Sequence, residues 1–392
     1  MLDTRPQFHT DTAKVLHSLQ RVLKETQAEF TATDQLDIRA EESRGGVIKK
    51  TLQQLRGTGL FGLAVRDALP DALEATRRLA RLDGSLAQIP QSHFVFSRYL
   101  TPDTPMWTDV REGTVLVANA QVDLEPVVVT PNGNGRQQLH GSKRFCTGST
   151  YADVIAVVIQ GEDVVFLPVG STGLEVVDNW QAVGQEYTGS GTVRLNGVDI
   201  QDAPRYRLDG GTGDRVTGNR MAAVRHHGVF AQALHAAIDL GIFEGAVEAA
   251  YALAGVPRES IDPALAAVLG EVDVRLFAAQ AAFDRIQLAL ERADRASLMA
   301  GLVTVEPARS AADIALEVTR AKLVIQDAAL EGLTKLFEVA GSAGYLGSRA
   351  LDRRWRDLRV HSLHDKRRNK IRLLGEHVGA GVELPLDGKL GG

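Results

Sequence analysis

Residues 141–153 read GSKRFCTGSTYAD, a strand that ends at Thr147–Gly148–Ser149 and runs into a turn. Backbone N–H groups and hydroxyls at such a turn can hydrogen-bond the polar edge of a flat heterocycle. An ordinary hairpin has the same pattern, so this stretch alone leaves both interpretations open. The stretch also lies in a run of short strands between two helical regions, and this order indicates the fold class.

Hydrophobic spacing predicts the elements on either side. Apolar residues at helical spacing predict helices in 12–30, 47–55, 72–82, 229–254, 263–293 and 310–340. Short β-branched segments predict strands at 115–118, 154–159, 164–169 and 192–200. Helices, then strands, then long helices are typical of an α+β protein, and the close spacing of the strands favours an antiparallel barrel or sandwich. No GxGxxG follows a strand, which argues against a Rossmann fold.

We therefore predict an N-terminal helical domain over 1–106, a central β-domain over 107–206 and a C-terminal helical bundle over 207–392. A Gly- and Asp-rich segment, RLDGGTGDRVTGN at 207–219, predicts the loop that begins the third domain.

Composition excludes several classes of protein. The 392 residues carry a net charge of −5, which argues against a nucleic-acid binder. The apolar runs are too short to cross a membrane, and MLDTRPQFHT does not resemble a secretory signal. A single cysteine, Cys146, excludes an intramolecular disulfide and fits a reducing compartment. We expect a cytoplasmic protein.

Two further stretches offer groups for a binding site. In NWQAVGQEYTGSGTVRLNGV, residues 179–198, Trp180 and the turn near Ser190 provide an aromatic wall and hydroxyls. A core tryptophan followed by a plain Gly-Ser loop is the alternative interpretation.

In LDRRWRDLRVHSLHDKRRNK, residues 351–370, apolar residues are interleaved with many cations. One side of this segment is then packed, and the basic side can hold an anion such as a phosphate, although basic runs are usually solvated faces.

The histidines of the last stretch suggest proton transfer. His361 and His364 stand three residues apart, and an imidazole titrates near neutral pH. Either histidine can instead be structural. We do not predict a metal site, because no further ligand is spaced to complete a coordination shell. His226, His227 and His235 are interpreted as structural.

Together these stretches resemble the acyl-CoA dehydrogenase superfamily over nearly the whole chain. GSKRFCTGSTYAD resembles its flavin-wrapping segment, NWQAVGQEYTGSGTVRLNGVDI its second β-domain signature, and LDRRWRDLRVHSLHD its closing helix. The last motif, with the TGSG turn, is most similar to the dibenzothiophene monooxygenase and sulfur-acquisition branch. The resemblance implies a C-terminal four-helix bundle, a homotetramer and a flavin, FMN or FAD. A partner reductase would supply the flavin in reduced form, and its C4a-peroxide would oxygenate a small substrate containing sulfur, nitrogen or an aromatic ring.

The resemblance also implies roles for individual residues. The catalytic positions fall on His364, His93, Asn119 and Thr147. The flavin-binding positions fall on Phe145, Cys146, Thr147, Trp180, Ser190, Trp355 and Lys370.

Departures from the dehydrogenase pattern keep other functions open. The position of the dehydrogenase base in the closing helix is Asp365, which we interpret as a structural or ion-paired residue and not as the base. The Arg that contacts the flavin phosphate in relatives is Ala267 here, for which Arg275 or the KRRNK cluster would have to substitute. The main alternative is an FAD-dependent acyl-CoA dehydrogenase. A scaffold that no longer binds flavin is a second alternative.

Overall fold

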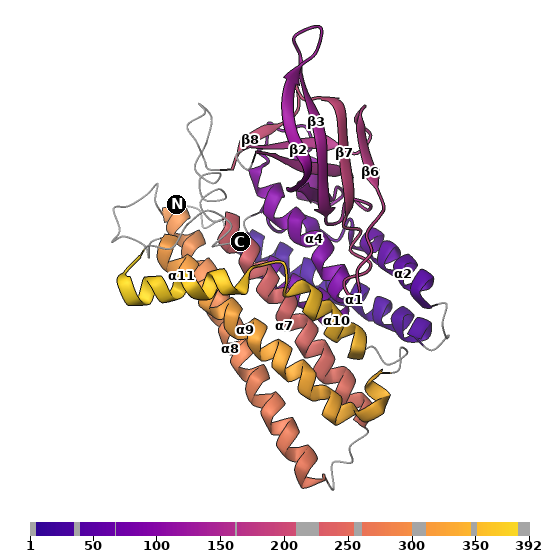
Figure 1. Cartoon of the computed structure of the whole chain (residues 1–392), viewed down its shortest axis with the longest axis vertical. Coiled ribbons are helices and arrows are strands. Elements are labelled where there is room, and N and C mark those ends of the chain that lie inside the picture. Colours follow the sequence, from indigo (N-terminus) through magenta and orange to yellow (C-terminus); the bar gives the residue numbers. More distant parts are fainter. Residues whose placement is uncertain are drawn as a thin grey trace.

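A computed structural model describes residues 5–34, 40–66, 68–160, 163–208, 227–254, 261–299, 311–345 and 351–382. Before the strands come helices α1 (Arg5–Asp34), α2 (Ala40–Leu55), η1 (Leu60–Gly62), α3 (Leu69–Leu82), α4 (Gly84–Phe96), η2 (Ser97–Tyr99) and α5 (Trp107–Glu112). After the strands come α7 (His227–Ala254), α8 (Pro263–Met299), α9 (Ala311–Ala340), η3 (Gly341–Tyr345), α10 (Leu351–His361) and α11 (Arg367–Ala380). In Figure 1 the strands gather at one end, with α4 below them and the long helices leading away.

The strands form two four-stranded sheets. One sheet has the order β1-β4-β5-β8 and the other β2-β3-β7-β6. The strands are β1 (Val117–Ala120), β2 (Val122–Pro131), β3 (Gln137–Cys146), β4 (Val154–Ile159), β5 (Asp163–Pro168), β6 (Leu174–Val177), β7 (Gly191–Asp199) and β8 (Arg205–Arg207). All pairs are antiparallel except β1–β4, which is parallel.

Strand β4 shows why the β1-β4-β5-β8 sheet is an inner layer. All six residues of Val154–Ile159 are buried. Ile155, Val157 and Ile159 belong to the core between the two sheets, whereas the side chains that alternate with them belong to the helical core. Side chains of a strand alternate between its two faces, so a strand apolar at every position is covered on both. The sheet therefore lies between the other sheet and the helices.

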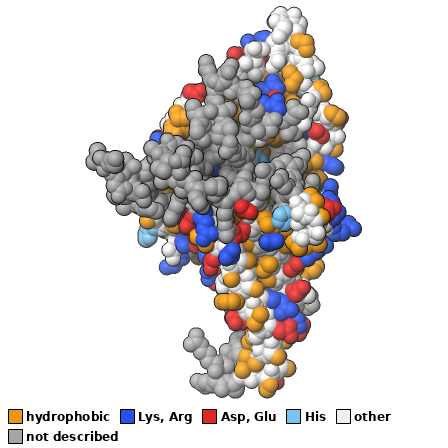
Figure 2. All heavy atoms as spheres, turned by 90° about the vertical axis from the view of Figure 1, so that its left-hand side faces the viewer, with side chains coloured by type: hydrophobic (Ala, Val, Ile, Leu, Met, Phe, Trp, Pro, Cys, Tyr) orange, Lys and Arg blue, Asp and Glu red, His pale blue; other side chains and the backbone are white. Residues whose placement is uncertain are grey.

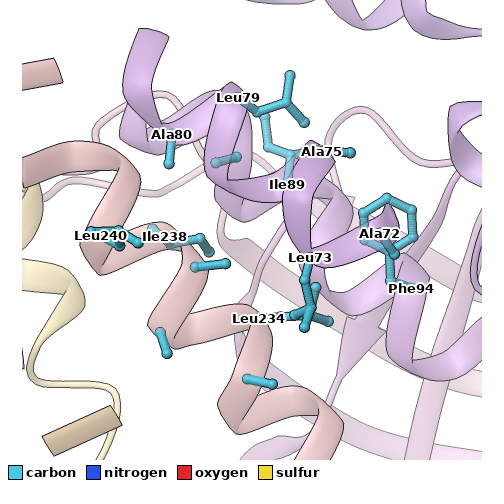
Figure 3. Packing of buried hydrophobic residues seen from close by; sticks show 14 of the residues in the cluster. Ala72, Leu73, Ala75, Leu79, Ala80, Ile89, Phe94, Leu234, Ile238 and Leu240 are labelled. Carbon is cyan, nitrogen blue, oxygen red and sulfur yellow. The ribbon is translucent and has the colours of Figure 1, made fainter. Parts of the chain in front are cut away.

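The helical core joins the two ends of the chain. In Figure 3, Leu73 and Ala80 of α3 face Leu234 and Ile238 of α7, and all four are fully buried. The first and third helical regions thus share one hydrophobic core. This shared packing holds α4 between the bundle and β1.

The α+β class and its order of helices, strands and helices are confirmed, with differences in detail. The antiparallel pairing predicted for the β-domain is found in the other strand pairs, whereas β1 runs parallel to its neighbour β4. The predicted closing helix is interrupted after His361, so that a turn separates α10 from α11. Most of the predicted loop over 207–219 lies outside the described residues.

Within the described part of the chain, no helix combines the length and hydrophobicity needed to cross a membrane. On the face in Figure 2, the described acidic and basic side chains are interspersed with hydrophobic ones.

Candidate active site

The loop between β6 and β7 docks onto two helices. The Gln185 backbone N–H donates to Asp357 Oδ1 of α10 at 2.5 Å, and the Tyr187 N–H donates to Ser85 Oγ of α4 at 3.3 Å. A Cβ added at Gly184 would lie 2.3 Å from the Arg356 carbonyl oxygen, so the contact with α10 requires glycine. The loop, α4 and α10 are thereby held in one place.

This loop carries a chain of buried hydroxyls that reaches β3. Thr188 Oγ1 donates to the Gln185 carbonyl at 3.0 Å, and Ser190 Oγ lies 2.8 Å from Thr188 Oγ1. Thr147 Oγ1 lies 3.0 Å from Ser190 Oγ. Because the Thr188 proton is used by the carbonyl, Ser190 donates to Thr188 and Thr147 to Ser190 in this arrangement. Thr147 then offers lone pairs to a ligand. Two predicted residues, Thr147 and Ser190, are in direct contact.

An aromatic pair lies beside the hydroxyls. Phe145 is 55% exposed, and its ring meets Trp180 edge to face with centroids 6.2 Å apart. Trp180 Nε1 donates to the Gln185 carbonyl at 2.8 Å, which anchors the indole. Phe145 has a φ of 58°, and the β3–β7 register shifts between Lys143 and Cys146. This irregularity directs Phe145 outward at the end of the strand.

Cys146, next to Phe145, faces the opposite way. Its side chain is fully buried in the core between the sheets, and burial raises the pKa of its thiol to about 12. We predicted Cys146 as a flavin-lining residue. Its side chain lies inside the β-core instead, so only its backbone can line a site at the surface of β3.

Asn119 and Gln88 bring unsatisfied oxygens to the same region. A Cβ at Gly148, next to Thr147, would lie 3.4 Å from the Ile89 carbonyl oxygen of α4 and 3.7 Å from Ala118 Cβ of β1. Gln88 directly precedes Ile89 in the sequence, and Asn119 directly follows Ala118. Asn119 Oδ1 and Gln88 Oε1 are buried and have no hydrogen-bond partner within the described chain. Buried amide oxygens are normally satisfied, so both are candidate acceptors for a ligand.

His364 is held from both sides in the turn after α10. Its Nδ1–H donates to the His361 carbonyl at 3.1 Å, and its Nε2 accepts from Gln88 Nε2 at 3.3 Å. The His364 side chain has access to solvent, although many protein atoms lie close to its ring. Burial lowers the pKa of His364, and the nearby His361 and Lys322 add to this effect. His364 is therefore neutral at physiological pH and has a fixed tautomer.

His93, the second predicted catalytic histidine, is fully buried. Its Nε2–H donates to the Phe61 carbonyl at 2.6 Å, and its Nδ1 accepts from the Val117 N–H at 3.0 Å. Burial lowers its pKa to about 4. Both ring nitrogens are therefore used by backbone groups. In this arrangement His93 ties η1 and β1 to α4 and has no free nitrogen for proton transfer.

Lys370 lies in a buried charged cluster. Lys370 and Lys322 of α9 donate to Gln232 Oε1 at 2.8 and 2.7 Å, and Lys322 also pairs with Asp365 Oδ2. Asp365 accepts from Gln232 Nε2 at 3.3 Å and lies 3.7 Å from Lys370. The interpretation of Asp365 as ion-paired is confirmed. We predicted Lys370 as a cofactor ligand, but it is 2% exposed and faces this cluster.

The remaining predicted groups lie farther along the helices. Trp355 is 37% exposed on α10, and its Nε1 donates to Thr334 Oγ1 of α9 at 3.3 Å. Ala267 is exposed on α8, and Arg275 pairs with Glu331 at 3.3 Å. In the part of the chain that the structure describes, none of these three side chains hydrogen-bonds the hydroxyl chain or His364. Among the described residues, no group of His, Cys, Asp or Glu is arranged to hold a metal ion.

A cavity of about 790 Å³ lies elsewhere, between α1, α3 and α7. Its charged side chains pair with one another, as in Arg77–Glu244 at 2.7 Å and Arg78–Glu74 at 2.7 Å. None of the predicted site residues line it. We therefore place the candidate site at the junction of β3, the β6–β7 loop, α4 and the α10–α11 turn.

Sequence reasoning missed Gln88. A signal was present, since Gln88 is a polar residue in an α4 stretch where every residue is buried. A buried amide needs a partner, and this one finds His364 from the far end of the chain.

Comparison with known proteins agrees with the fold. Residues 233–367 match the family described as "Acyl-CoA dehydrogenase, C-terminal domain". The dibenzothiophene monooxygenase of Mycolicibacterium goodii is 27% identical over 90% of this chain and 92% of that protein. The probable FMNH2-dependent monooxygenase SfnC of Pseudomonas putida is 28% identical over 86% and 89%. The crystal structure of FMN-bound TdsC from Paenibacillus sp. A11-2 has a TM-score of 0.75 at 22% identity, covering 95% of this chain and 99% of TdsC.

Residues 233–367 therefore match the acyl-CoA dehydrogenase C-terminal domain, and the chain as a whole has the fold of TdsC and is similar in sequence to two proteins named as monooxygenases.

Proposed function

We propose that the protein is a reduced-flavin-dependent monooxygenase that uses FMN and acts on a small organic substrate containing sulfur, nitrogen or an aromatic ring. Two relatives that align along most of the chain are named as monooxygenases, one of them FMNH2-dependent. The candidate site offers groups suited to a flavin. At the position of the dehydrogenase base, Asp365 is held in an ion pair.

The residues at the site fit a flavin ring. The exposed edge-to-face pair of Phe145 and Trp180 offers an apolar wall. Thr147 Oγ1 offers lone pairs, and the unsatisfied oxygens of Asn119 and Gln88 can accept N–H groups of the ring. A reduced flavin bound here would supply two electrons to O2. One oxygen atom then enters the substrate and the other leaves as water.

The state of Asp365 is the observation that favours oxygenation over dehydrogenation. A dehydrogenase needs a carboxylate that can remove a proton from the carbon next to a thioester. Asp365 is instead paired with Lys322 and hydrogen-bonded by Gln232. A carboxylate stabilised by a cation and a donor is a weak base. His364 differs from His93 in that its Nε2 accepts from the side chain of Gln88, which can rotate away, and not from a backbone group. His364 is the nearby group that we propose takes part in proton handling.

Isotope labelling tests the proposal. The protein would receive FMN and a flavin reductase under ¹⁸O2, with dibenzothiophene and indole as probe substrates. We expect a product that carries one ¹⁸O atom, and a large loss of this product in His364→Ala. His377→Ala is the matched control, because His377 is a half-buried histidine of α11 whose side chain, within the described residues, bonds the Val382 carbonyl.

Two other results would favour the alternatives. Anaerobic bleaching of a flavin-loaded sample by an acyl-CoA would support the dehydrogenase. A titration that detects no binding of FMN, FAD or their reduced forms would support the scaffold without flavin.

We further propose that the protein acts in the cytoplasm as a homotetramer that receives its flavin from a transiently bound reductase. Exposed apolar side chains support self-association, among them Val274 at 66% and Phe277 at 72% on α8 and Val378 at 72% on α11. Light scattering on the purified protein would give the oligomeric state, and a monomeric mass would contradict the proposal.

A further inference from the structure

Three histidine rings meet where α7 packs against the α10–α11 turn. The ring centroids of His235 and His361 are 5.0 Å apart, those of His235 and His364 5.3 Å, and those of His361 and His364 5.1 Å. His235 lies on α7 one turn before Asp239, so both side chains are on the same face of that helix. The sequence suggested only a structural histidine at 235.

Hydrogen bonds link two of these rings to a buried carboxylate. His361 Nδ1–H donates to Asp239 Oδ1 at 2.6 Å, and both residues are at most 2% exposed. His361 Nε2 lies 2.9 Å from His235 Nδ1. Asp239 Oδ2 has no hydrogen-bond partner within the described chain. The order is therefore Asp239, His361, His235, and only one proton can lie between the two rings.

The chain has two hydrogen-bonded states that differ by one proton. When His361 is neutral, its bare Nε2 accepts from His235 Nδ1–H, and His235 Nε2 is a proton acceptor. When His361 is an imidazolium, it donates from Nε2 to His235 Nδ1, and His235 Nε2–H is a donor. A proton added at His235 Nε2 thus ends as a charge on His361, beside Asp239.

The surrounding charges favour this location of the positive charge. Burial lowers the pKa of His235, and Lys322 from α9, His361 at the end of α10, His364 from the turn and Lys370 from α11 lower it further. A cation on His235 would face these groups without a carboxylate of its own. A cation on His361 is 2.6 Å from Asp239 Oδ1. His235 therefore transmits a proton and does not hold the charge.

We propose that Asp239, His361 and His235 form a proton relay whose open end is His235 Nε2, the ring nitrogen of His235 that does not face His361. The relay rests on the proposed function, because oxygenation consumes a proton. With a reduced flavin anion bound, the flavin would supply two electrons and one proton, O2 would give one atom to the substrate, and the second atom would need one more proton to leave as water. His235 Nε2 releases that proton while its Nδ1 takes the proton from His361 Nε2. Asp239 and His361 are positioning residues.

The relay can be tested in the flavin-free protein. Solid-state ¹⁵N NMR of histidine-labelled protein between pH 5 and 9 distinguishes the protonated nitrogens. We expect the charging of His361 and the switch of His235 from Nδ1–H to Nε2–H to share one midpoint. Asp239→Asn should lower this midpoint by at least about one pH unit, because it removes the adjacent negative charge. Separate midpoints, or a His235 that keeps one tautomer throughout, would overturn the relay.

Kinetics give a second readout. With FMN, a reductase and the two probe substrates, His235→Ala should lower the product formed per reduced FMN consumed by about tenfold or more, within the usual range for a proton-transfer group. Substituted imidazoles should restore it in the order of their pKa values, which a purely structural gap would not produce. The control is His227→Ala, because His227 is a neutral histidine of α7 whose Nδ1 contacts Tyr99 Oη at 2.9 Å.

The two proposals can fail separately. If the wild-type protein forms no product, the proposed function fails for these substrates and the NMR titration alone decides the relay. If the wild type oxygenates a probe and His235→Ala is as active as His227→Ala, the relay is overturned while the monooxygenase proposal stands.

Discussion

Replacing Asp365 by Asn should destabilise the protein far more than replacing its partner Lys322 by Met. The cluster holds two buried lysines, Lys322 and Lys370, with one carboxylate within 4 Å. Asp365→Asn leaves two buried cations without the carboxylate that lies within 4 Å of both. Removing one member of a buried ion pair typically costs about 3–5 kcal/mol. Lys322→Met leaves one cation for one carboxylate.

The contacts explain why Lys322→Met should be mild. In this variant Lys370 still donates to Gln232 Oε1 at 2.8 Å, and Asp365 still accepts from Gln232 Nε2 at 3.3 Å. Both Lys370 and Asp365 therefore retain a hydrogen-bond partner. Replacing a buried charge by an apolar side chain of similar size is often neutral or stabilising. We expect a change within about 1 kcal/mol.

The pH dependence has a definite sign. Burial, and then the repulsion of Lys370, lower the pKa of Lys322 to about 7, and burial lowers that of Lys370 to about 8. Lysines of the unfolded chain titrate at about 10.4. From pH 7 to 10 the unfolded chain therefore binds more protons than the folded chain, and the contribution of these two lysines to stability rises with pH. The cost of Asp365→Asn should therefore be larger at pH 6 than at pH 9, where the lysines can lose their protons.

The assay is urea unfolding followed by tryptophan fluorescence at pH 6, 7.5 and 9, with all variants at one protein concentration because self-association affects apparent stability. Equal destabilisation by Asp365→Asn and Lys322→Met would refute the charge-balance reasoning. So would a cost of Asp365→Asn that grows as the pH rises.

Other substitutions test the site itself. Gly184→Ala should lower stability and FMN affinity together, measured by unfolding and flavin titration, because its Cβ would meet the Arg356 carbonyl at 2.3 Å; unchanged affinity would contradict the role of the loop. Cys146 should resist alkylation at pH 8 until the protein unfolds, since burial raises its thiol pKa to about 12; rapid labelling of native protein would argue against this burial. Thr147→Val should weaken binding of reduced FMN more than Ser190→Ala does, because Thr147 ends the hydroxyl chain; equal effects would place the ligand elsewhere.

Local sequence patterns determine the elements well. The long apolar stripes mark α7, α8 and α9, and the continuous run Val154–Ile159 forms β4 as predicted. These features follow from neighbouring residues, because helical and strand spacing fix which side chains share a face. The contact of Thr147 with Ser190 also agrees with the two motifs that contain them. Strand direction is not a local property, and the parallel pairing of β1 with β4 could not be read from the chain.

The sequence by itself determined the order of helices and strands and the stretches that supply the site, because these depend on spacing over a few residues. Only the tertiary structure decided what each polar group does. Both ring nitrogens of His93 form hydrogen bonds with backbone groups in the folded protein. His364 forms a hydrogen bond with Gln88, which lies 276 residues away in the sequence. In the same way, His361 pairs with Asp239. Hydrogen bonds and burial set the tautomer and charge of a histidine, and both come from residues that are distant in the chain and meet only after folding.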